Sequence, residues 1–335
     1  MKCLVIRLSS IGDIVLTTPV VRCLKLQCPE AEVHYLTRKA YAPLLAANPY
    51  IDKLHTVSGS LREVLPALQQ EQFDRVIDLH HNIRSWRIKR ALRVPSFSFP
   101  KLNIEKWLFT AFKIDHLPDT HIVDRYLSTL HSLGVTNDGR GLDYFIPSGE
   151  MIHEKDLPLS HQAGYIAIVI GAALPTKQLP EDKIAQLCTG VQYPVILMGG
   201  PSERNKGEAI ASLDPGKIYN ACGKFSLNES ADLLRRSRLV VTPDTGMMHI
   251  AAALQKPILS IWGNTVPKLG MYPYYGQNGS MAQEDRFEVN GLSCRPCSKI
   301  GYQKCPRGHF NCMQQQDIPS IIRQIHLRLG KNVGE

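Results

Sequence analysis

The sequence predicts an α/β protein with two doubly wound domains that face each other across a cleft. Three observations predict this class. The chain has 335 residues, enough for two domains of roughly 150 residues each. Short β-rich runs alternate with helical patterns in both halves, an order that produces parallel strands joined by crossover helices. Between the two series, residues 145–163 carry two prolines and little periodicity, as expected of an interdomain linker.

Each element follows from its own pattern of apolar side chains. In the first half, strands are predicted over 2–7, 33–37, 53–57 and 75–79, and helices over 13–27, 41–47 and 61–70. In the second half, strands are predicted over 165–170, 194–198, 239–242 and 257–262, and helices over 181–189, 203–212, 227–237 and 247–254. An amphipathic helix over 317–329 ends the pattern.

The resulting domain organisation has three parts. We expect an N-terminal domain over residues 1–155, a C-terminal domain over 156–316, and a C-terminal helix over 317–335 that packs back toward the N-terminal domain. Hydrophobic residues at 44% and charged residues at 21% argue against wholesale disorder. No apolar run approaches the ~20 residues that cross a bilayer. Arg7 interrupts the apolar start of the chain, so a signal peptide is not indicated and a cytoplasmic protein is expected.

Two strand-to-helix turns could bind an anionic ligand. The turn Ser9–Asp13 is small and polar and opens a helix, whose first N–H groups are free. Asp13 is then either a helix cap or a general base aimed into the cleft. The turn Asp244–Gly246 also lies between a strand and a helix, and His249 follows one turn later. Such a helix start suits a diphosphate, although a capping Asp or Thr and a core histidine would show the same pattern.

Two further strand-end turns belong to the same predicted sheet. Thr176 and Lys177 follow the strand over 165–170 and could neutralise a phosphate. Glu203 follows the strand over 194–198 and could accept a hydrogen bond from a ribose hydroxyl. Each signal is weak alone, but three strand-end turns in one domain favour a nucleotide site.

These motifs together resemble glycosyltransferase family 9, the ADP-heptose–lipopolysaccharide heptosyltransferases. The resemblance lies in residues 9–13 with Pro19, in residues 243–249 with the alanines at 251–252, in residues 261–265 and in residues 294–297. It implies a GT-B fold, with the acceptor on the N-terminal domain and the sugar nucleotide on the C-terminal domain.

The resemblance also implies roles for individual residues. Asp13 matches the catalytic base of the family, and Lys177 matches its phosphate-binding lysine. The residues that match its nucleotide-diphosphate turn are Asp244, Thr245, Gly246 and His249. Glu203 stands where a ribose ligand is expected, and Ser10 and Gly12 are expected on the acceptor side.

The implied reaction is inverting transfer of heptose from ADP-heptose to a lipopolysaccharide inner-core acceptor. It needs a base for the acceptor hydroxyl and a stabilised diphosphate leaving group. A helix N-terminus and Lys177 can carry that charge, and no Asp-x-Asp metal signature is present, so no cofactor is expected for catalysis. Another nucleotide-activated sugar remains open. A nucleotide-binding oxidoreductase would need the three-glycine fingerprint that is missing here, and a non-catalytic binding protein would not need Asp13.

The net charge of +9 favours an anionic partner. Arg84 and Arg87 share a helical face within a basic segment, so we expect them to contact the anionic lipopolysaccharide core unless they are simply a solvated face. The charge also permits peripheral association with the inner membrane. Nucleic acid is not expected, because no aromatic platform accompanies the charge.

Four of the nine cysteines cluster near the end of the chain, with spacings of two, seven and six residues: Cys294, Cys297, Cys305 and Cys312. Four thiols at this density are a candidate structural zinc site, with His309 as an alternative ligand. Oxidised pairs and free thiols remain alternatives, because the spacing is not that of a standard zinc knuckle.

Overall fold

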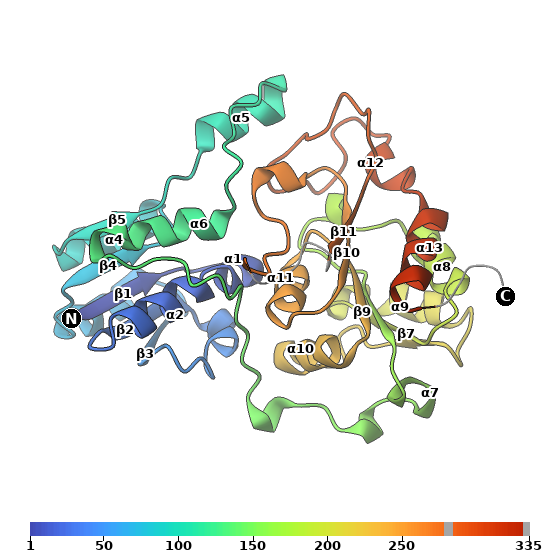
Figure 1. The fold of residues 1–335 in the computed structure, drawn as a ribbon, viewed down its shortest axis with the longest axis horizontal. Coiled ribbons are helices and arrows are strands. Elements are labelled where there is room, and N and C mark those ends of the chain that lie inside the picture. Colours follow the sequence, from blue (N-terminus) through green and yellow to red (C-terminus); the bar gives the residue numbers. More distant parts are fainter. Residues whose placement is uncertain (278–283, 331–335) are drawn as a thin grey trace.

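The computed structural model describes residues 1–277 and 284–330. Two α/β halves lie side by side, each built around a parallel sheet (Figure 1). The strands of the first sheet, in the order β3-β2-β1-β4-β5, are β1 (Lys2–Ile6), β2 (Glu32–Arg38), β3 (Lys53–Val57), β4 (Arg75–Asp78) and β5 (Ser96–Ser98).

The second sheet has the order β11-β10-β9-β6-β7-β8. Its strands are β6 (Ile166–Val169), β7 (Val195–Met198), β8 (Ile218–Asn220), β9 (Leu239–Pro243), β10 (Ile258–Trp262) and β11 (Glu284–Glu288). Every neighbouring pair in both sheets is parallel. The fold is therefore the predicted pair of parallel α/β domains, and β5, β8 and β11 are strands that the sequence patterns did not indicate.

Helices and short 3-10 turns connect the strands. The helices are α1 (Ile11–Val15), α2 (Thr18–Gln27), α3 (Leu61–Gln70), α4 (Ile83–Leu92), α5 (Asn103–Phe112), α6 (Ile122–Leu127), α7 (Leu159–Gln162), α8 (Glu181–Gly190), α9 (Arg204–Ala211), α10 (Leu227–Arg236), α11 (Gly246–Ala253), α12 (Asn311–Gln314) and α13 (Ile318–Arg328). The 3-10 turns used below are η1 (Lys39–Leu44), η5 (Pro175–Lys177) and η6 (Pro201–Glu203). Among the described helices, none combines the length and apolar character needed to cross a bilayer.

The helix predicted over 13–27 is two helices in the structure. α1 ends at Val15, and α2 starts at Thr18 with Pro19 in its first turn. Proline has no N–H to donate and its ring clashes with the carbonyl four residues earlier, so one helix cannot run through this point. The break leaves α1 as a single short turn of helix that presents Asp13.

The strand register brings the functional turns to one edge of each sheet. Ile6 at the end of β1 pairs with Leu36 of β2 and Asp78 of β4. In both sheets the strand order reverses beside the strand that carries a candidate turn: between β1 and β4 in the first, and between β6 and β9 in the second. Such switch points at the carboxyl ends of parallel strands are where ligands bind in α/β sheets.

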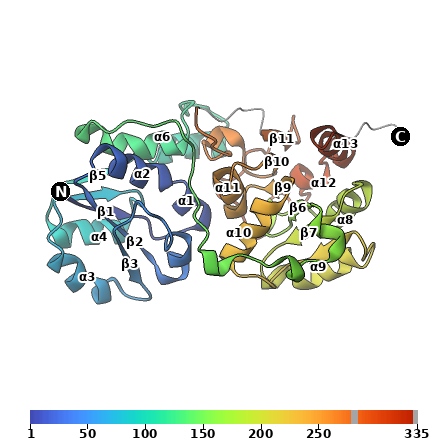
Figure 2. The same ribbon diagram turned by 60° about the horizontal axis from the view of Figure 1, so that its bottom comes forward.

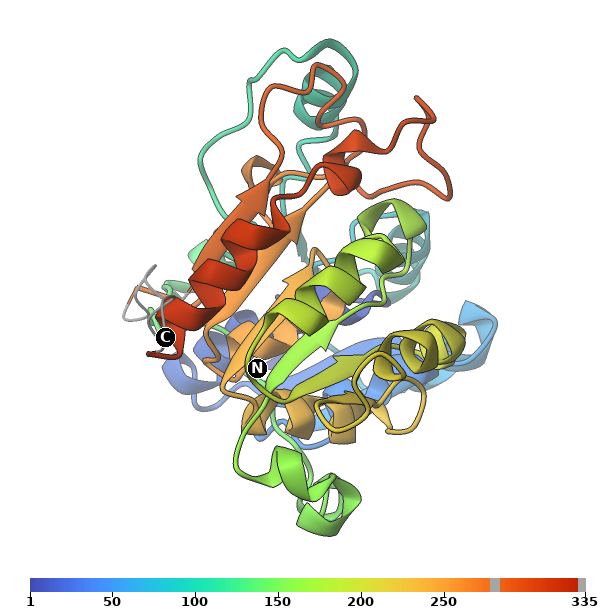
Figure 3. The same ribbon diagram turned by 90° about the vertical axis from the view of Figure 1, so that its right-hand side faces the viewer.

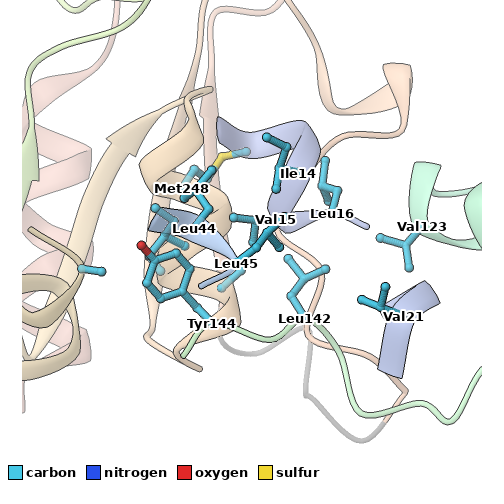
Figure 4. Close-up of a cluster of buried hydrophobic side chains, with 14 of the residues drawn as sticks. Ile14, Val15, Leu16, Val21, Leu44, Leu45, Val123, Leu142, Tyr144 and Met248 are labelled. Carbon is cyan, nitrogen blue, oxygen red and sulfur yellow. The ribbon is translucent and has the colours of Figure 1, made fainter. Parts of the chain in front are cut away.

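One hydrophobic core joins the two halves. It includes side chains of α1 and η1 from the first half and Met248 of α11 from the second. Figure 4 shows Ile14, Val15 and Leu44 beside Met248, with Tyr144 next to them. Tyr144 also donates a 2.5 Å hydrogen bond to Asn228 of α10. The edge where the two halves meet is thus a packed interface.

The segment between the sheets and the C-terminal helix lie at opposite sides of the second half. Residues 145–163 pass along one side of the molecule and contain α7 (Figure 2). α13 packs against α8, with Ile322 beside Gly190, and Figure 3 shows it in red in front of the second sheet. The expectation that this helix packs back toward the N-terminal domain is wrong. Its apolar face, with Ile321 and Ile325, completes the core of the second half instead.

Candidate active site

The first component of the site is the short helix α1, which follows β1. Asp13 lies in its first turn and accepts hydrogen bonds from Ser10 N at 3.1 Å and Ser10 Oγ at 2.8 Å. Arg7 Nη2 lies 2.7 Å from Asp13 Oδ1. Burial by itself would raise the Asp13 pKa, but the Arg7 charge and the Ser10 hydrogen bonds outweigh it, so the pKa is lowered. Asp13 is therefore an oriented carboxylate that is ionised at neutral pH.

Arg7 holds this arrangement from the buried side. Its guanidinium donates to Ser9 O at 2.8 Å, to Tyr126 Oη at 3.0 Å and to the Leu79 carbonyl. An arginine bound to three fixed groups can hold a carboxylate in one position. No sequence pattern indicated a site role for Arg7, which only interrupts the apolar start of the chain. Its position at the end of a predicted strand, next to the Ser9–Asp13 turn, is the feature that could have indicated one.

The second component is the start of α11, which follows β9. Thr245 is the N-cap residue, and the backbone N–H groups of the first turn point out of the helix without intrahelical partners. Asp244 lies just before it and accepts hydrogen bonds from Lys177 Nζ at 2.7 Å and Thr265 Oγ1 at 2.8 Å. The turn therefore combines free N–H groups and a positive dipole end, which suit an anion, with Lys177 held beside it by Asp244.

Glycines allow the two helix starts to touch. A Cβ on Gly12 would lie 2.5 Å from His249 Cδ2 and 3.3 Å from Gly246 Cα. A Cβ on Gly246 would lie 2.7 Å from the Ile11 side chain. Neither position could carry a larger side chain without separating α1 from α11. The sequence suggested Gly12 as an acceptor contact; in the structure, it also permits the contact between the two halves.

His249 is buried in this contact. Burial lowers the pKa of His249 to about 4, so the ring is neutral at physiological pH. Its Nδ1 has no hydrogen-bond partner among the described residues. Buried polar atoms are seldom left unpaired in a native protein, and this ring lines the cavity described next. His249 is thus placed to contact a bound ligand.

Two cavities meet at the start of α11. The larger, about 520 Å³, has Glu203 on its wall together with apolar side chains such as Val169, Met198 and Phe225. The smaller, about 280 Å³, contains Asp13, Lys177, Asp244 and His249. Both share Ser10, Gly12, Ala173, Thr245 and Gly246. A ligand with an apolar ring at one end, a diphosphate in the middle and a polar group at the other end fits this pair of cavities.

Glu203 ends the turn η6 beside the larger cavity. Its carboxylate accepts from Gly200 N at 2.8 Å and from Ser202 Oγ at 2.9 Å, and a Cβ on Gly171 would lie 2.9 Å from it. The absence of side chains at residues 171, 199 and 200 leaves the carboxylate accessible from the cavity. This placement is compatible with contact to a ligand hydroxyl.

Thr176 lies elsewhere. Its hydroxyl donates to Tyr302 O at 2.9 Å and accepts from Tyr302 N at 2.7 Å, and it lines a small cavity near the cysteines, not the two cavities of the cleft. In this structure Thr176 ties the cysteine-containing segment to the second half, while its neighbour Lys177 reaches the cleft.

Arg84 and Arg87 are also outside the two cleft cavities. Arg84 lines a separate cavity of about 570 Å³ at the ends of β2 and β3, together with Arg38 and Lys39. Arg84 and Arg87 also border an adjoining hollow with Arg62. None of these five cations forms an ion pair with an acidic side chain in the described part of the chain. They form a concentrated positive surface on the first half.

Three lysines that the sequence patterns did not single out lie in the neighbourhood of the Asp13 cavity. Lys101 and Lys106 lie close enough to Asp13 for the charges to interact, and Lys299 interacts with both lysines. Burial, together with the charges of Arg125 and Lys299, lowers the pKa of Lys106 to about 8. The three come from segments far from residue 13 in the sequence, so only folding reveals that they gather there.

The four clustered cysteines line one small cavity with His309. Cys294 Sγ lies 3.9 Å from His309 Nε2, and all nine cysteines are free thiols, so the oxidised pairs left open by the sequence are not present. Burial raises the pKa of Cys312 to about 11. A metal site needs at least three ligand atoms close together. Within the described residues, one group of His, Cys, Asp or Glu side chains has its ligand atoms within 4.8 Å of one another, and it consists of His34, His55 and Glu71. The cysteines do not meet that spacing.

The group of His34, His55 and Glu71 lies away from the cleft, on β2, β3 and the end of α3. Lys2 Nζ lies 3.1 Å from the Glu71 carboxylate, and Lys53 also pairs with it. Two ammonium groups thus already neutralise the carboxylate, and they would have to move before a cation could bind.

Comparisons with known proteins identify the family of the chain. A model of glycosyltransferase family 9 (heptosyltransferase) matches residues 61–294. Lipooligosaccharide heptosyltransferase 2 of Haemophilus influenzae is 26% identical over 80% of this chain and 85% of its own length. Lipopolysaccharide heptosyltransferase 3 of Escherichia coli is 27% identical over 76% of this chain and 80% of its own.

Solved structures show the same GT-B fold. A family 9 glycosyltransferase from Veillonella parvula superposes with a TM-score of 0.77 at 24% identity, covering 98% of this chain and 97% of its own. An Escherichia coli heptosyltransferase solved with ADP superposes with a TM-score of 0.69 at 20% identity, covering 98% of this chain and all of its own. With a family match across most of its length and this fold, the chain belongs to glycosyltransferase family 9, the heptosyltransferase family.

Proposed function

We propose that this glycosyltransferase moves a heptose from ADP-heptose to a hydroxyl of a lipopolysaccharide inner-core acceptor, with inversion and without a metal ion. One observation carries the proposal: two cavities meet at the bare N-terminus of α11, with Glu203 in one and the Arg7-bound Asp13 in the other. The relatives named as lipopolysaccharide heptosyltransferases support the sugar and the acceptor.

The donor spans both cavities in this proposal. Adenine enters the larger cavity among Val169, Met198 and Phe225, and Glu203 accepts from the ribose. The diphosphate lies over the N–H groups that start α11, where the helix dipole favours negative charge. The sugar then occupies the smaller cavity beside Asp13. An Escherichia coli heptosyltransferase of the same fold was solved with ADP, which favours adenine here.

At the anomeric carbon, the reaction forms one bond and breaks one. The acceptor oxygen attacks the anomeric carbon from the face opposite the diphosphate, and the bond from that carbon to the diphosphate oxygen breaks. The electron pair of that bond leaves with ADP, and the acceptor proton passes to Asp13. Attack from the opposite face inverts the anomeric carbon. Because its pKa is lowered, Asp13 is ionised and ready to accept the proton near neutral pH.

Lys177 and the start of α11 stabilise the departing ADP. Without ligand, Lys177 pairs with Asp244, which keeps its ammonium at the edge of the cavity instead of in solvent. A bound diphosphate brings more negative charge to the same place, so Lys177 can contact it without a large movement. Lys177 and the start of α11 supply the positive charge that a divalent cation supplies in metal-dependent glycosyltransferases. We therefore propose metal-independent transfer.

The acceptor is anionic in this proposal. Arg38, Lys39, Arg62, Arg84 and Arg87 surround adjoining hollows without acidic partners among the described residues. Phosphates and sugar carboxylates of an inner core match such a surface. Reversing the charge at residues 84 and 87 should raise the KM for acceptor and leave ADP affinity unchanged. Equal weakening of both would contradict the assignment.

We retain a structural zinc ion at the cysteine cluster as a separate proposal. Thiols from four positions line one cavity. A thiol binds zinc only after it has lost its proton and become a thiolate. Metal analysis of protein purified without chelators tests it. About one equivalent of zinc that is lost in a Cys294→Ser/Cys297→Ser variant would support the proposal, and metal-free wild-type protein would reject it.

Calorimetric titration with ADP, UDP, GDP and NAD, without added metal, tests the donor. Selective ADP binding supports ADP-heptose; preference for UDP or GDP changes the donor; binding of NAD alone would instead favour an oxidoreductase. Asp13→Ala should abolish transfer while retaining ADP binding. Near-normal turnover in that variant would reject Asp13 as the base.

A further inference from the structure

Helix α5 carries an apolar face that the rest of the described chain does not cover. None of its residues is buried, and Ile104, Trp107 and Phe112 are 71%, 56% and 58% exposed. Ile114, just beyond the helix, is 45% exposed. The rings of Trp107 and Phe112 pack edge to face at 5.0 Å. We call these four side chains the α5 patch; large apolar groups gathered in this way usually mark an interaction surface.

Helix α5 projects from the body of the molecule, and residues at both its ends contact the second half. In Figures 1 and 3, α5 projects from the body of the molecule, next to the segment that follows β11. Lys299 Nζ lies 3.4 Å from Asn103 Oδ1 at the start of α5. At its other end, Lys113 donates to the Pro296 carbonyl at 2.6 Å. These contacts hold the helix in one position with its apolar face outward.

The α5 patch borders the mouth of the cavity that holds Asp13. Lys299 and Ile300 line that cavity, and Lys299 also contacts α5. Ile300 is 61% exposed and adds an apolar side chain at the cavity rim. A molecule held on the α5 patch would lie beside the entrance through which an acceptor hydroxyl reaches Asp13.

Several cations lie on or near α5. Lys106 is in the helix and Lys101 just before it, both within electrostatic range of Lys299, and Arg307 is within electrostatic range of Lys113. None of these five forms an ion pair with an acidic side chain among the residues the structure describes. Aromatic and aliphatic side chains ringed by lysine and arginine are typical of helices that lie in the interface of an anionic bilayer.

We propose that the α5 patch inserts into the headgroup region of an anionic phospholipid bilayer and holds the mouth of the Asp13 cavity at the lipid surface. This inference rests on the proposed function, because a lipid-linked acceptor is the reason for the Asp13 cavity to lie at the lipid surface. The membrane is favoured over a protein partner because five cations that form no ion pair among the described residues lie on or near α5, against one acidic side chain on the helix, Glu105. One short helix gives reversible binding.

Vesicle flotation without donor nucleotide tests the proposal. We compare vesicles of phosphatidylglycerol and phosphatidylethanolamine with vesicles of phosphatidylcholine alone. Wild-type protein should float with the anionic vesicles, and the bound fraction should fall as salt is raised. Trp107→Ser/Phe112→Ser should weaken this binding at least ~tenfold, because two of the inserting side chains are gone. Its melting temperature should remain that of wild type, since α5 contributes no buried side chain.

The matched control removes exposed apolar groups elsewhere. Leu159, 84% exposed on α7, and Leu213, 56% exposed after α9, both belong to the second half, and Figure 1 shows α7 at the opposite end of the molecule from α5. Leu159→Ser/Leu213→Ser should bind vesicles as wild type does. Equal loss in this variant, or no preference of the wild type for anionic vesicles, would overturn the proposal.

Two further readouts separate this inference from the proposed function. Light scattering detects a second copy on the patch: a dimer that the Trp107→Ser/Phe112→Ser variant dissociates would overturn membrane docking. Transfer to a lipid-free acceptor should be unchanged in that variant, and transfer to an acceptor embedded in vesicles should fall. If ADP fails to bind while vesicle binding follows the pattern above, the proposed function fails and the membrane surface stands.

Discussion

A single added methyl group at Gly12 should test how α1 and α11 build the site together. In Gly12→Ala, the new Cβ would lie 2.5 Å from His249 Cδ2 and 3.3 Å from Gly246 Cα. Carbon atoms in contact prefer about 3.5–4.0 Å, so the two helices must separate by about 1 Å. His249 is only 2% exposed, and the next atom that the methyl group meets belongs to the backbone of α11, so the strain falls on the contact between the two helices.

The displacement should affect activity more than binding of the nucleotide. Asp13 is the next residue along α1, and a misplacement of about 1 Å near reacting groups lowers the rate by about a hundredfold. Overpacking of this kind also costs about 1–3 kcal/mol of stability. We therefore expect kcat to fall by about two orders of magnitude, with a lower melting temperature. ADP affinity should change less, because Glu203 and the apolar side chains proposed to contact ribose and adenine lie on the second half.

Steady-state transfer kinetics, thermal melting and ADP titration measure these effects. Gly149→Ala is the matched control, since a Cβ there meets no atom within 4 Å, and it should behave as wild type. The methyl group should destabilise the protein less in a His249→Ala background, where the clashing ring is absent. Wild-type kcat and melting temperature in Gly12→Ala would refute this account of the contact.

Three other changes have defined outcomes. Arg7→Met should shift the acid limb of the kcat/KM profile to higher pH, because Arg7 lowers the Asp13 pKa; an unshifted limb in pH-rate measurements would contradict this. Lys177→Ala should weaken ADP binding by about ten- to a hundredfold, the loss of one charge-assisted hydrogen bond of about 1.5–3 kcal/mol; titration that gives wild-type affinity would remove Lys177 from the diphosphate site. Hydrogen bonding to Lys53 lowers the pKa of Glu71 from 4.5 to about 2, so its contribution to stability is complete above pH 4.5 and is lost as pH falls toward 2. Glu71→Gln should therefore reduce the melting temperature at neutral pH and make it less dependent on pH between about 4.5 and 2, and parallel melting curves for the two proteins would count against that linkage.

Local patterns were sufficient for the repeating units of the fold. Strands such as β1 and β9 are five residues long and contain short continuous apolar runs, and small or polar residues follow them where a helix starts. These features depend on neighbours in the sequence, so they can be read without the structure. The short strands β5 and β8, of three residues each, are too short to show a period and form only because a neighbouring strand supplies their hydrogen bonds.

The site also has features that local patterns identify and contacts that they do not. Asp13, Asp244 and Lys177 could be singled out because each lies at the end of a predicted strand or in the turn after it. Their pairing could not be predicted. Asp244 holds Lys177 through a contact between residues 67 positions apart, and Arg7, at the end of a buried strand, holds Asp13. Thr176, one residue from Lys177, faces the cysteine segment because the turn η5 points consecutive side chains in different directions.

Local patterns were enough to predict the two α/β halves and the two turns that line the cleft, because periodicity and turn chemistry act over a few residues. Which side chains meet depends on how the folded chain packs. The packing of α13 on α8, the electrostatic coupling of Lys101 and Lys106 to Lys299 and Asp13, and the apolar face left open on α5 all depend on surfaces brought together from distant parts of the chain. Burial and charge pairing are set by those surfaces, and no local pattern contains them.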